Sequence, residues 1–321
     1  MLDRLVAVGR ALRAGYKTGI GPRVRFDSRS HRVDCGTGLQ RCAALVCRES
    51  IAYARVSRID GTSFECNRQH MTSRERTGIL PRPYAIADRL CGNRTARDWT
   101  TLIAFGALNA AFLLTGLYGG SSKAKLTLLK RLGLPPDALP HLGAWKADVG
   151  LLRLVADHIL EKKPRTVVEF GTGASTLIIG RALGLCGSEE TVFVSLDQHE
   201  DFTDKTREWL AEHGIEADLR VAPLIPAPGG WPGLWYDDQA LPRTIDFMLV
   251  DGPPWSIHPF TRGAAATLFD RIPVGGVVML DDGARAGERV VAARWRALRP
   301  DFRFELVWSG SKGTLVGTRL R

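Results

Sequence analysis

Residues 166–176 read TVVEFGTGAST and combine a strand pattern, a glycine turn and the start of a helix. Its first half, Thr166 to Phe170, is a run of β-branched and apolar residues typical of a buried strand. Gly171 and Gly173 follow, and glycine allows the sharp turn and close backbone approach that a strand-to-helix connection needs. The residues from Ser175 to Leu185 then fit a helix. The stretch therefore predicts a strand–turn–helix unit.

On both sides of this unit, strand and helix patterns alternate along the chain. Further strands are predicted at 192–196, 218–221, 245–250 and 277–280, with helices at 145–161, 202–213 and near 284–298. The chain ends in two strands, 302–308 and 314–318, joined by residues 309–313. Short apolar strands that alternate with helices indicate a parallel sheet covered on both faces. We therefore predict an α/β, Rossmann-like, doubly wound and mostly parallel seven-stranded sheet ending in an antiparallel hairpin.

The glycine turn and the end of the next strand carry the first chemical signal. Free backbone N–H groups at the start of the helix suit a ligand that approaches the turn. Asp197 ends the strand VFVSLD, where its carboxylate can accept hydrogen bonds from both hydroxyls of a ribose. A purely structural glycine turn, and an Asp197 that only caps the next helix, are the alternatives. Thr176 stands where a dinucleotide-binding fingerprint needs its third glycine, which counts against a nicotinamide oxidoreductase.

At these residues the sequence resembles the class I S-adenosylmethionine-dependent methyltransferases. The resemblance covers about Trp145 to Arg321 and rests on four features: the E-x-G-x-G turn at Glu169–Gly173, Asp197, LVDGPP at 249–254, and PVGGVVMLDD at 273–282. The terminal hairpin matches as well. The last two stretches look most like bacterial enzymes that act on small molecules, glycans and natural products. The resemblance implies S-adenosyl-L-methionine as cofactor, with its methionine part beside Glu169, Gly171, Gly173 and Ser175, and its ribose at Asp197.

Three further acids follow the next two predicted strands. Asp251 comes after the strand 245–250, and Asp281 and Asp282 come after 277–280. Carboxylates that converge at one edge of a sheet can bind a divalent cation such as Mg²⁺, which would orient the hydroxyls of a methyl acceptor. Alternatively, Asp281 or Asp282 caps the following helix and Asp251 faces the substrate. His258 is the candidate general base, because its ordinary pKa of about 6.5 suits proton removal near neutrality. Asp251 is the second candidate catalytic residue.

Residues 223–243 read as a long irregular insertion that contains Trp231, Trp235 and Tyr236. Long loops inside compact domains are commonly lids or binding loops. Their aromatic rings are expected either to stack on a substrate or to cover the edge of the sheet.

Charge is distributed unevenly along the 321 residues, whose formal net charge is +10. Residues 1–100 contain 19 basic residues (Lys and Arg) and 9 acidic ones (Asp and Glu), whereas residues 101–321 contain 25 basic and 25 acidic residues. The C-terminal part therefore lacks the basic surface that binding of nucleic acid needs. We expect residues 1–100 to be a poorly ordered, arginine-rich extension without chemistry of its own. Five of the six cysteines lie there, without metal-ligand spacing, and free thiols are expected.

A hydrophobic segment and a linker are predicted between the extension and the C-terminal domain. Residues 102–118, LIAFGALNAAFLLTGLY, contain no charge, but seventeen residues are near the lower limit for a spanning helix. The segment 101–120 is expected either to anchor the chain in the inner or plasma membrane, or to be a buried helix or an inert hydrophobic tail. Basic residues after it would keep the catalytic domain in the cytoplasm. Residues 121–144 are predicted to be a linker, and 145–321 the methyltransferase domain.

The sequence thus predicts an enzyme that transfers a methyl group from S-adenosylmethionine, to an oxygen of a small molecule or glycan, and no nucleic-acid partner. Two alternatives remain open at this stage. One is a nicotinamide-binding oxidoreductase. The other is a non-catalytic protein that has a methyltransferase-like fold.

Overall fold

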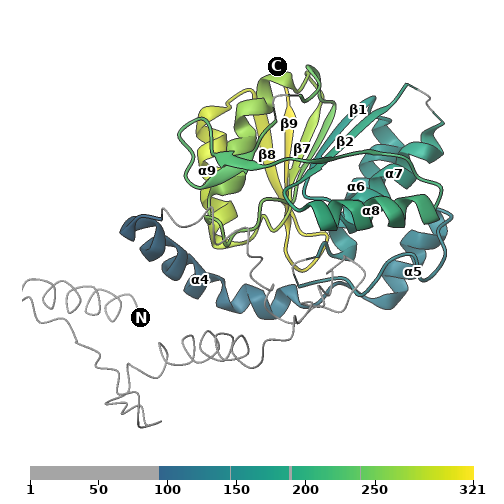
Figure 1. Ribbon diagram of the computed structural model, residues 1–321, viewed down its shortest axis with the longest axis horizontal. Coiled ribbons are helices and arrows are strands. Elements are labelled where there is room, and N and C mark those ends of the chain that lie inside the picture. Colours follow the sequence, from purple (N-terminus) through teal and green to yellow (C-terminus); the bar gives the residue numbers. More distant parts are fainter. Residues whose placement is uncertain (1–93, 145, 188–189, 239) are drawn as a thin grey trace, which may run out of the picture. The chain divides into compact units, whose positions relative to one another are not determined.

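The computed structural model describes residues 94–321, apart from 145, 188, 189 and 239 (Figure 1). A seven-stranded sheet has the order β3-β2-β1-β6-β7-β9-β8. Its strands are β1 (Thr166–Phe170), β2 (Val192–Asp197), β3 (Asp218–Val221), β6 (Phe247–Val250), β7 (Val277–Leu280), β8 (Phe302–Val307) and β9 (Thr314–Arg319). The first five are parallel, whereas β9 runs antiparallel to β7 and to β8. The predicted fold class and terminal hairpin are confirmed.

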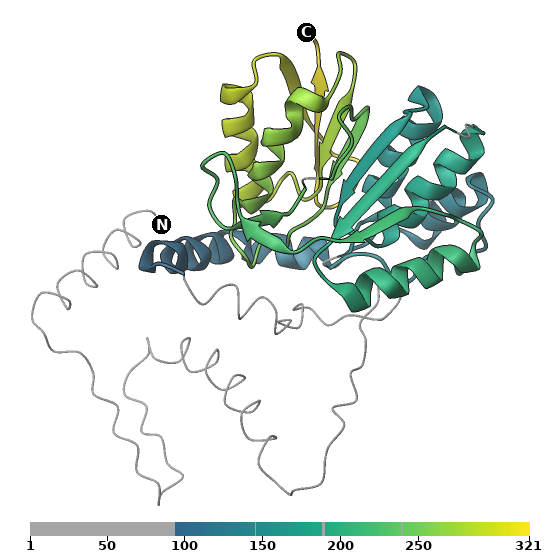
Figure 2. The same ribbon diagram turned by 45° about the horizontal axis from the view of Figure 1, so that its top comes forward.

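Helices lie on both faces of the sheet, as Figure 2 shows. A layer of buried hydrophobic side chains covers each face. Consecutive strand residues point to opposite faces, so that Val167 packs in one layer and Val168 in the other. Helices α5 (Ser122–Arg131), α6 (Val149–Lys162), α7 (Ala174–Cys186) and α8 (Glu200–Glu212) contribute to the first layer. Strands β4 (Leu224–Pro226) and β5 (Leu234–Tyr236), the 3₁₀ helix η1 (Thr261–Arg271) and helix α9 (Ala286–Leu298) contribute to the second.

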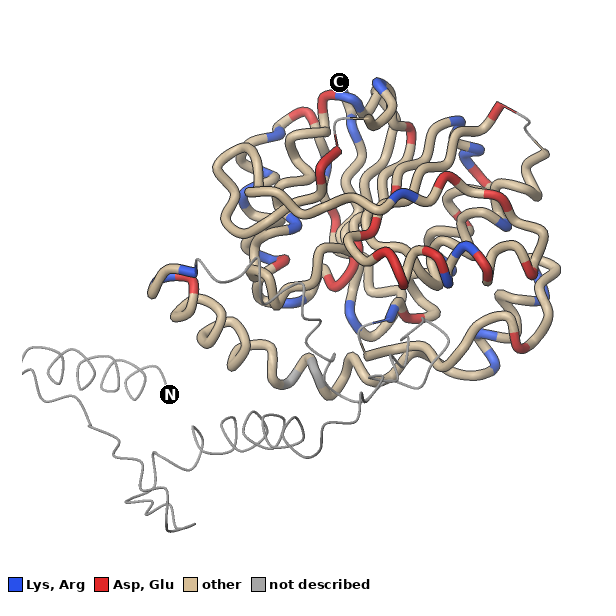
Figure 3. Tube along the Cα trace, viewed as in Figure 1, with Lys and Arg blue, Asp and Glu red and all other residues tan. Residues whose placement is uncertain are grey.

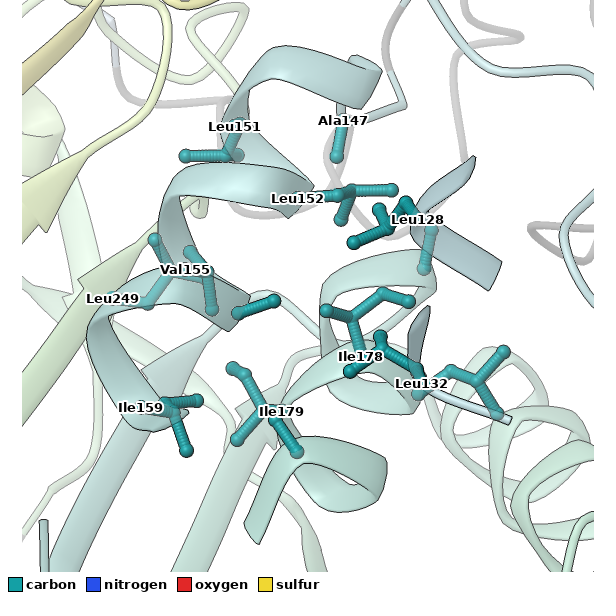
Figure 4. Close-up of a cluster of buried hydrophobic side chains, with 14 of the residues drawn as sticks. Leu128, Leu132, Ala147, Leu151, Leu152, Val155, Ile159, Ile178, Ile179 and Leu249 are labelled. Carbon is teal, nitrogen blue, oxygen red and sulfur yellow. The ribbon is translucent and has the colours of Figure 1, made fainter. Parts of the chain in front are cut away.

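The stretch 121–144, expected to be a linker, instead contains helix α5 and belongs to the domain. Leu128, Leu129 and Leu132 are fully buried and pack in the same hydrophobic cluster as Leu152 and Ile178 of α6 and α7 (Figure 4). Ser121 caps the helix by accepting a hydrogen bond from the Ala124 N–H. Burial of three leucines places this helix in the core rather than between two parts of the chain.

The insertion 223–243 is not wholly irregular, because β4 and β5 pair in it as a two-stranded antiparallel ribbon. Trp235 and Tyr236 are fully buried and pack against Phe170 at the end of β1. The Trp231 ring lies under the Arg294 guanidinium of α9, 4.1 Å from the ring centroid. These aromatic rings therefore cover the sheet, which is the second of the two roles that the sequence left open.

The hydrophobic segment forms helix α4 (Ala96–Gly116), which begins five residues before the predicted boundary. The helix packs on the domain through the edge-to-face contact of Phe105 with Phe260 and through Asn109, whose Oδ1 accepts a hydrogen bond from the Ala286 N–H at the start of α9. Trp99 and Ile103 stay exposed. Within residues 94–321 as described, no helix has the length and hydropathy needed to cross a membrane. A spanning anchor at 102–118 therefore has no support in the structure.

The arginine-rich stretch predicted to be disordered lies outside the described residues up to position 93, as do five of the six cysteines. The sixth, Cys186, is a free thiol at the end of α7, as the sequence predicts.

The chain order of the strands reverses between β1 and β6. From β1 the chain proceeds outward to β2 and β3, and it then returns to place β6 on the other side of β1. The carboxyl ends of β1 and β6 therefore lie side by side, and the Gly252 N–H donates to the Phe170 carbonyl over 2.7 Å. In open α/β sheets, ligands bind at such a reversal point, outside the carboxyl ends of the strands.

Candidate active site

The glycine turn after β1 uses conformations that favour glycine. Gly171 has a φ of +99° and Gly173 a φ of +149°, both in the region that other residues rarely adopt. A Cβ at Gly171 would lie 3.0 Å from the backbone nitrogen of Gly252, so the turns after β1 and β6 are in close contact. Thr176, which replaces the third fingerprint glycine, closes the turn by accepting a hydrogen bond of 2.7 Å from the Gly173 N–H.

Glu169 is a fully buried acid in the middle of this arrangement. Its Oε2 accepts hydrogen bonds of 2.6 Å from the hydroxyls of Thr176 and of Ser195 on β2. Ser175 also acts on it as a hydrogen-bond donor. Burial nevertheless raises the pKa of Glu169 from an ordinary 4.5 to about 7, and the charge of Asp197 acts in the same direction. The structure thus brings Glu169, Gly171, Gly173 and Ser175 together, as predicted.

Asp197 lies at the end of β2, on the other side of the same turn. Its Oδ2 accepts a hydrogen bond of 3.3 Å from the Thr172 N–H, and its Oδ1 one of 2.8 Å from the His199 N–H. Burial raises the pKa of Asp197 to about 7 as well. His199, not Asp197, is the N-cap residue of α8, so the capping alternative does not account for this acid.

Several buried polar atoms around the turn have no hydrogen-bond partner among the described residues. They are Glu169 Oε1, Thr172 Oγ1, Gln198 Oε1 and the Tyr236 hydroxyl. Such groups are rare, because each costs desolvation free energy without compensation, and they mark places where a ligand can bind. Donors and acceptors of this kind fit the ammonium, carboxylate and ribose groups of S-adenosylmethionine. We call Glu169, Asp197 and these neighbours the turn site.

Tyr236 was not predicted as part of the site. A Cβ at Gly252 would collide with the Tyr236 hydroxyl, so the ring lies directly on the turn after β6. Burial raises the pKa of this phenol well above its usual range, and the charges of Asp197 and Asp251 act in the same direction. The hydroxyl therefore remains protonated, next to the acids of both strand ends.

A second group of acids lies at the ends of β6 and β7. Asp251, Asp281 and Asp282 each offer a carboxylate oxygen, and these oxygens lie within 4.8 Å of one another. We call these three residues the carboxylate cluster. The predicted convergence is therefore present, whereas the capping alternative for Asp281 and Asp282 is wrong. Helix α9 has Arg285 at its N-cap, and its first N–H donates to Asn109 of α4 instead.

Three basic side chains, none of which was predicted, neutralise the carboxylate cluster. Arg262 of η1 lies 3.5 Å from Asp251 Oδ1 and 3.2 Å from Asp282 Oδ2, and it also donates to the Asp251 and Asp281 carbonyls. Arg285 contacts Asp282 at 2.8 Å, and Lys312 lies within 3.7 Å of Asp281 and Asp282. Burial alone would raise the pKa of Asp282, yet these charges hold it below its usual range. Figure 3 shows acidic positions gathered near the centre of the domain.

His258, the predicted general base, lies among other partners. Its Nδ1 accepts a hydrogen bond of 3.2 Å from the Phe260 N–H, and its Nε2 lies 3.9 Å from Asp98 of α4. Burial lowers the pKa of His258. None of the contacts found for the described residues joins His258 to the carboxylate cluster, so the structure gives the predicted role no support.

This chain matches known proteins by structure but not by sequence. No family model matches, and no curated protein matches by sequence. The structure is similar to the O-methyltransferase TomG from Streptomyces achromogenes, solved with S-adenosylmethionine (TM-score 0.41, 13% identity, 71% of this chain and 100% of that one). It is also similar to an O-methyltransferase from Bacillus cereus, solved with S-adenosylhomocysteine (0.43, 13%, 69% and 99%). A third is a methyltransferase from Geobacter sulfurreducens (0.41, 20%, 65% and 96%).

The mostly parallel seven-stranded sheet with its terminal antiparallel pair is the arrangement that the resemblance to class I methyltransferases led us to expect. The resemblance is therefore confirmed at the level of the fold.

Proposed function

We propose that this chain is an S-adenosylmethionine-dependent methyltransferase that acts on a hydroxyl of a small molecule or a glycan. The observation that carries the proposal is the turn site. Two buried acids, neither with an ion pair to a described residue, flank a glycine turn where the strand order reverses. A buried carboxylate without a cation favours a positively charged ligand, and S-adenosylmethionine carries an ammonium and a sulfonium.

The acids of the turn site and the residues of the adjoining glycine turn have different roles in holding the cofactor. Glu169 takes the ammonium, and its unpartnered Oε1 is the acceptor. Gly171 and Gly173 allow the backbone to approach the methionine part, and Ser175 helps to fix Glu169. Asp197 accepts hydrogen bonds from the ribose hydroxyls. When bound, the cofactor supplies an activated methyl group.

Transfer to oxygen requires an acceptor held in line and a group that receives its proton. Asp251 is suited to this role because its backbone lies against the Gly171 turn while its carboxylate faces Arg262. Its side chain is 15% exposed, against 3% for Asp282 and 1% for Asp281, so it is the member of the cluster that a substrate can reach. We therefore assign the proton-accepting role to Asp251 rather than to His258. Burial and the charge of Asp281 raise the pKa of Asp251, so its ionised carboxylate is a stronger base than an exposed one.

Calorimetric titration of the full chain with S-adenosylmethionine, S-adenosylhomocysteine and NAD tests the proposal. We expect micromolar binding of the two sulfur compounds and none of NAD. Asp197→Ala should weaken S-adenosylhomocysteine binding at least about tenfold, because hydrogen bonds to a charged group contribute roughly 1.5–3 kcal/mol. The exposed Asp137→Ala serves as the matched control and should bind as the wild type does. Binding of NAD would indicate an oxidoreductase, and binding of no ligand a non-catalytic protein.

A further inference from the structure

The carboxylate cluster has the composition of a divalent-cation site, but its surroundings do not fit one. Within the cluster, the buried carboxylate oxygens that have no hydrogen-bond partner among the described residues are Asp281 Oδ2 and Asp282 Oδ1. Both face the ammonium of Lys312, at 3.7 and 3.5 Å respectively. A cation that bound these oxygens at the usual distances of about 2.0–2.6 Å would compete for them with the lysine ammonium, which lies 3.5 and 3.7 Å from the same oxygens. Two positive charges would then occupy one small buried space.

The position of Lys312 is built into the fold. It lies in the short loop between β8 and β9, where the Gly283 N–H donates to the Gly313 carbonyl over 2.8 Å and the Ala284 N–H to the Lys312 carbonyl over 3.1 Å. The ammonium itself donates to the carbonyl of Lys146 over 2.7 Å. Only 3% of Lys312 is exposed. The backbone thus delivers the ammonium to the end of β7 and holds it there.

Asp148 fixes the loop from the opposite side. Its Oδ2 accepts hydrogen bonds from the backbone N–H of Ser311 at 2.8 Å and from its hydroxyl at 3.2 Å. Its Oδ1 caps α6 by accepting from the Leu151 N–H. One buried carboxylate therefore links the Lys312 loop to a core helix, which leaves the ammonium little freedom to move aside for a metal ion.

Side chains already compensate most of the negative charge in and next to the cluster. Arg262, Arg285 and Lys312 face Asp251, Asp281 and Asp282, and Arg262 also lies 3.9 Å from Glu288. Three cations thus oppose four acids. A divalent cation needs several carboxylate oxygens that are free to bind it, and here each acid is shared with a guanidinium or an ammonium.

We infer that Lys312 and Arg262 take the place of a divalent cation in this chain, so that the carboxylate cluster binds no metal and methyl transfer requires none. Arg262 donates hydrogen bonds to both the carboxylate and the main-chain carbonyl of Asp251. The Lys312 ammonium faces the carboxylates of Asp281 and Asp282. Both are positioning residues. The statement about transfer rests on the proposed function, whereas the statement about metal binding does not.

The test is a titration of the full chain with Mn²⁺, in which bound ion is measured by electron paramagnetic resonance. We expect the wild type to bind no Mn²⁺ up to millimolar concentration. Lys312→Met keeps the length of the side chain and removes its charge, so this variant should gain affinity at least tenfold. Lys312→Arg should not gain it, and neither should Lys123→Met, which removes an exposed lysine of α5.

Two results would overturn the inference. One is micromolar Mn²⁺ binding by the wild type that Asp281→Asn abolishes. The other is a folded Lys312→Met variant that gains no affinity, since Lys312 would then not be what excludes the ion. If Lys312→Met does not fold, the wild-type titration alone decides. A parallel titration with S-adenosylhomocysteine separates the two proposals, because a chain that binds neither ligand supports the metal inference while contradicting the proposed function.

Discussion

Two groups of buried acids lie at the same edge of the sheet, and they differ in the side chains that surround them. At the turn site, Glu169 and Asp197 receive hydrogen bonds from hydroxyl and backbone N–H groups, and burial raises the pKa of each to about 7. In the carboxylate cluster, Arg262, Arg285 and Lys312 lie directly against the acids and hold the pKa of Asp282 below its usual range, although burial still raises the pKa of Asp251 and Asp281. The first group is ready to accept positive charge from a ligand, whereas the second already has it from the chain.

An acidic residue at the end of a strand can therefore have either of two roles: to bind a cationic ligand or to form ion pairs within the chain. Sequence position assigns both groups to the same edge, and by composition the cluster resembles a metal site. Only the side chains that surround each carboxylate decide which ligand it can take. An acid without a cationic neighbour is costly to ionise in the free protein and favourable once a cation binds.

Removal of a cation from the cluster should have the largest effect. Arg262→Met should lower the free energy of unfolding by about 3–5 kcal/mol, because it leaves buried carboxylates without their partner. Urea denaturation measures the change. Arg289→Met, on the exposed side of α9, should alter it by less than about 0.5 kcal/mol. Equal stability of the two variants would remove the distinction between the two groups of acids.

Neutralising an acid of the turn site should change the free energy of unfolding in the opposite direction and by a somewhat smaller amount. The folded-state pKa of Glu169 is about 7, against an ordinary 4.5, so the folded chain keeps a proton that the unfolded chain loses as pH rises through this window. Ionisation of Glu169 therefore costs the wild type stability between about pH 4.5 and 7, by about 3 kcal/mol in total. Glu169→Gln should lack this loss.

Urea denaturation of both chains between pH 5 and 8 checks this prediction. The stability of Glu169→Gln relative to the wild type should increase as pH rises and should level off above about pH 7. A difference that stays constant with pH would show that the Glu169 carboxylate is not perturbed in the folded chain.

Most of the fold could be predicted because the strands that form the parallel sheet are short apolar runs with little ambiguity. Helix α5 was missed because its buried leucines stand among lysines and are followed by Gly133 and Pro135, which read as a break. The β4–β5 ribbon was missed because strands of three residues are too short to show alternation. Elements of this size become visible through tertiary packing rather than local pattern.

The acids of the site could be predicted, since carboxyl ends of neighbouring parallel strands must lie at one edge. Their neutralising partners could not. Lys312 reaches the cluster from a Ser-Gly-rich turn that reads as a simple hairpin connection, and Arg262 from a 3₁₀ helix that no pattern indicated. Likewise, the sequence left two roles open for Tyr236, stacking on a substrate or covering the edge of the sheet, and it gave no sign that the hydroxyl lies on Gly252. Contacts between distant segments carry no local signal in one sequence.

If the buried acids of the turn site hold a positively charged cofactor, its binding must release protons from them. The measurement is calorimetric titration of the full chain with S-adenosylmethionine at about pH 6.5, in two buffers of different ionisation enthalpy. With pKa values of about 7 for Glu169 and Asp197, binding should release about one to one and a half protons. Glu169→Gln should release about half as many. Binding without any proton release would contradict the account.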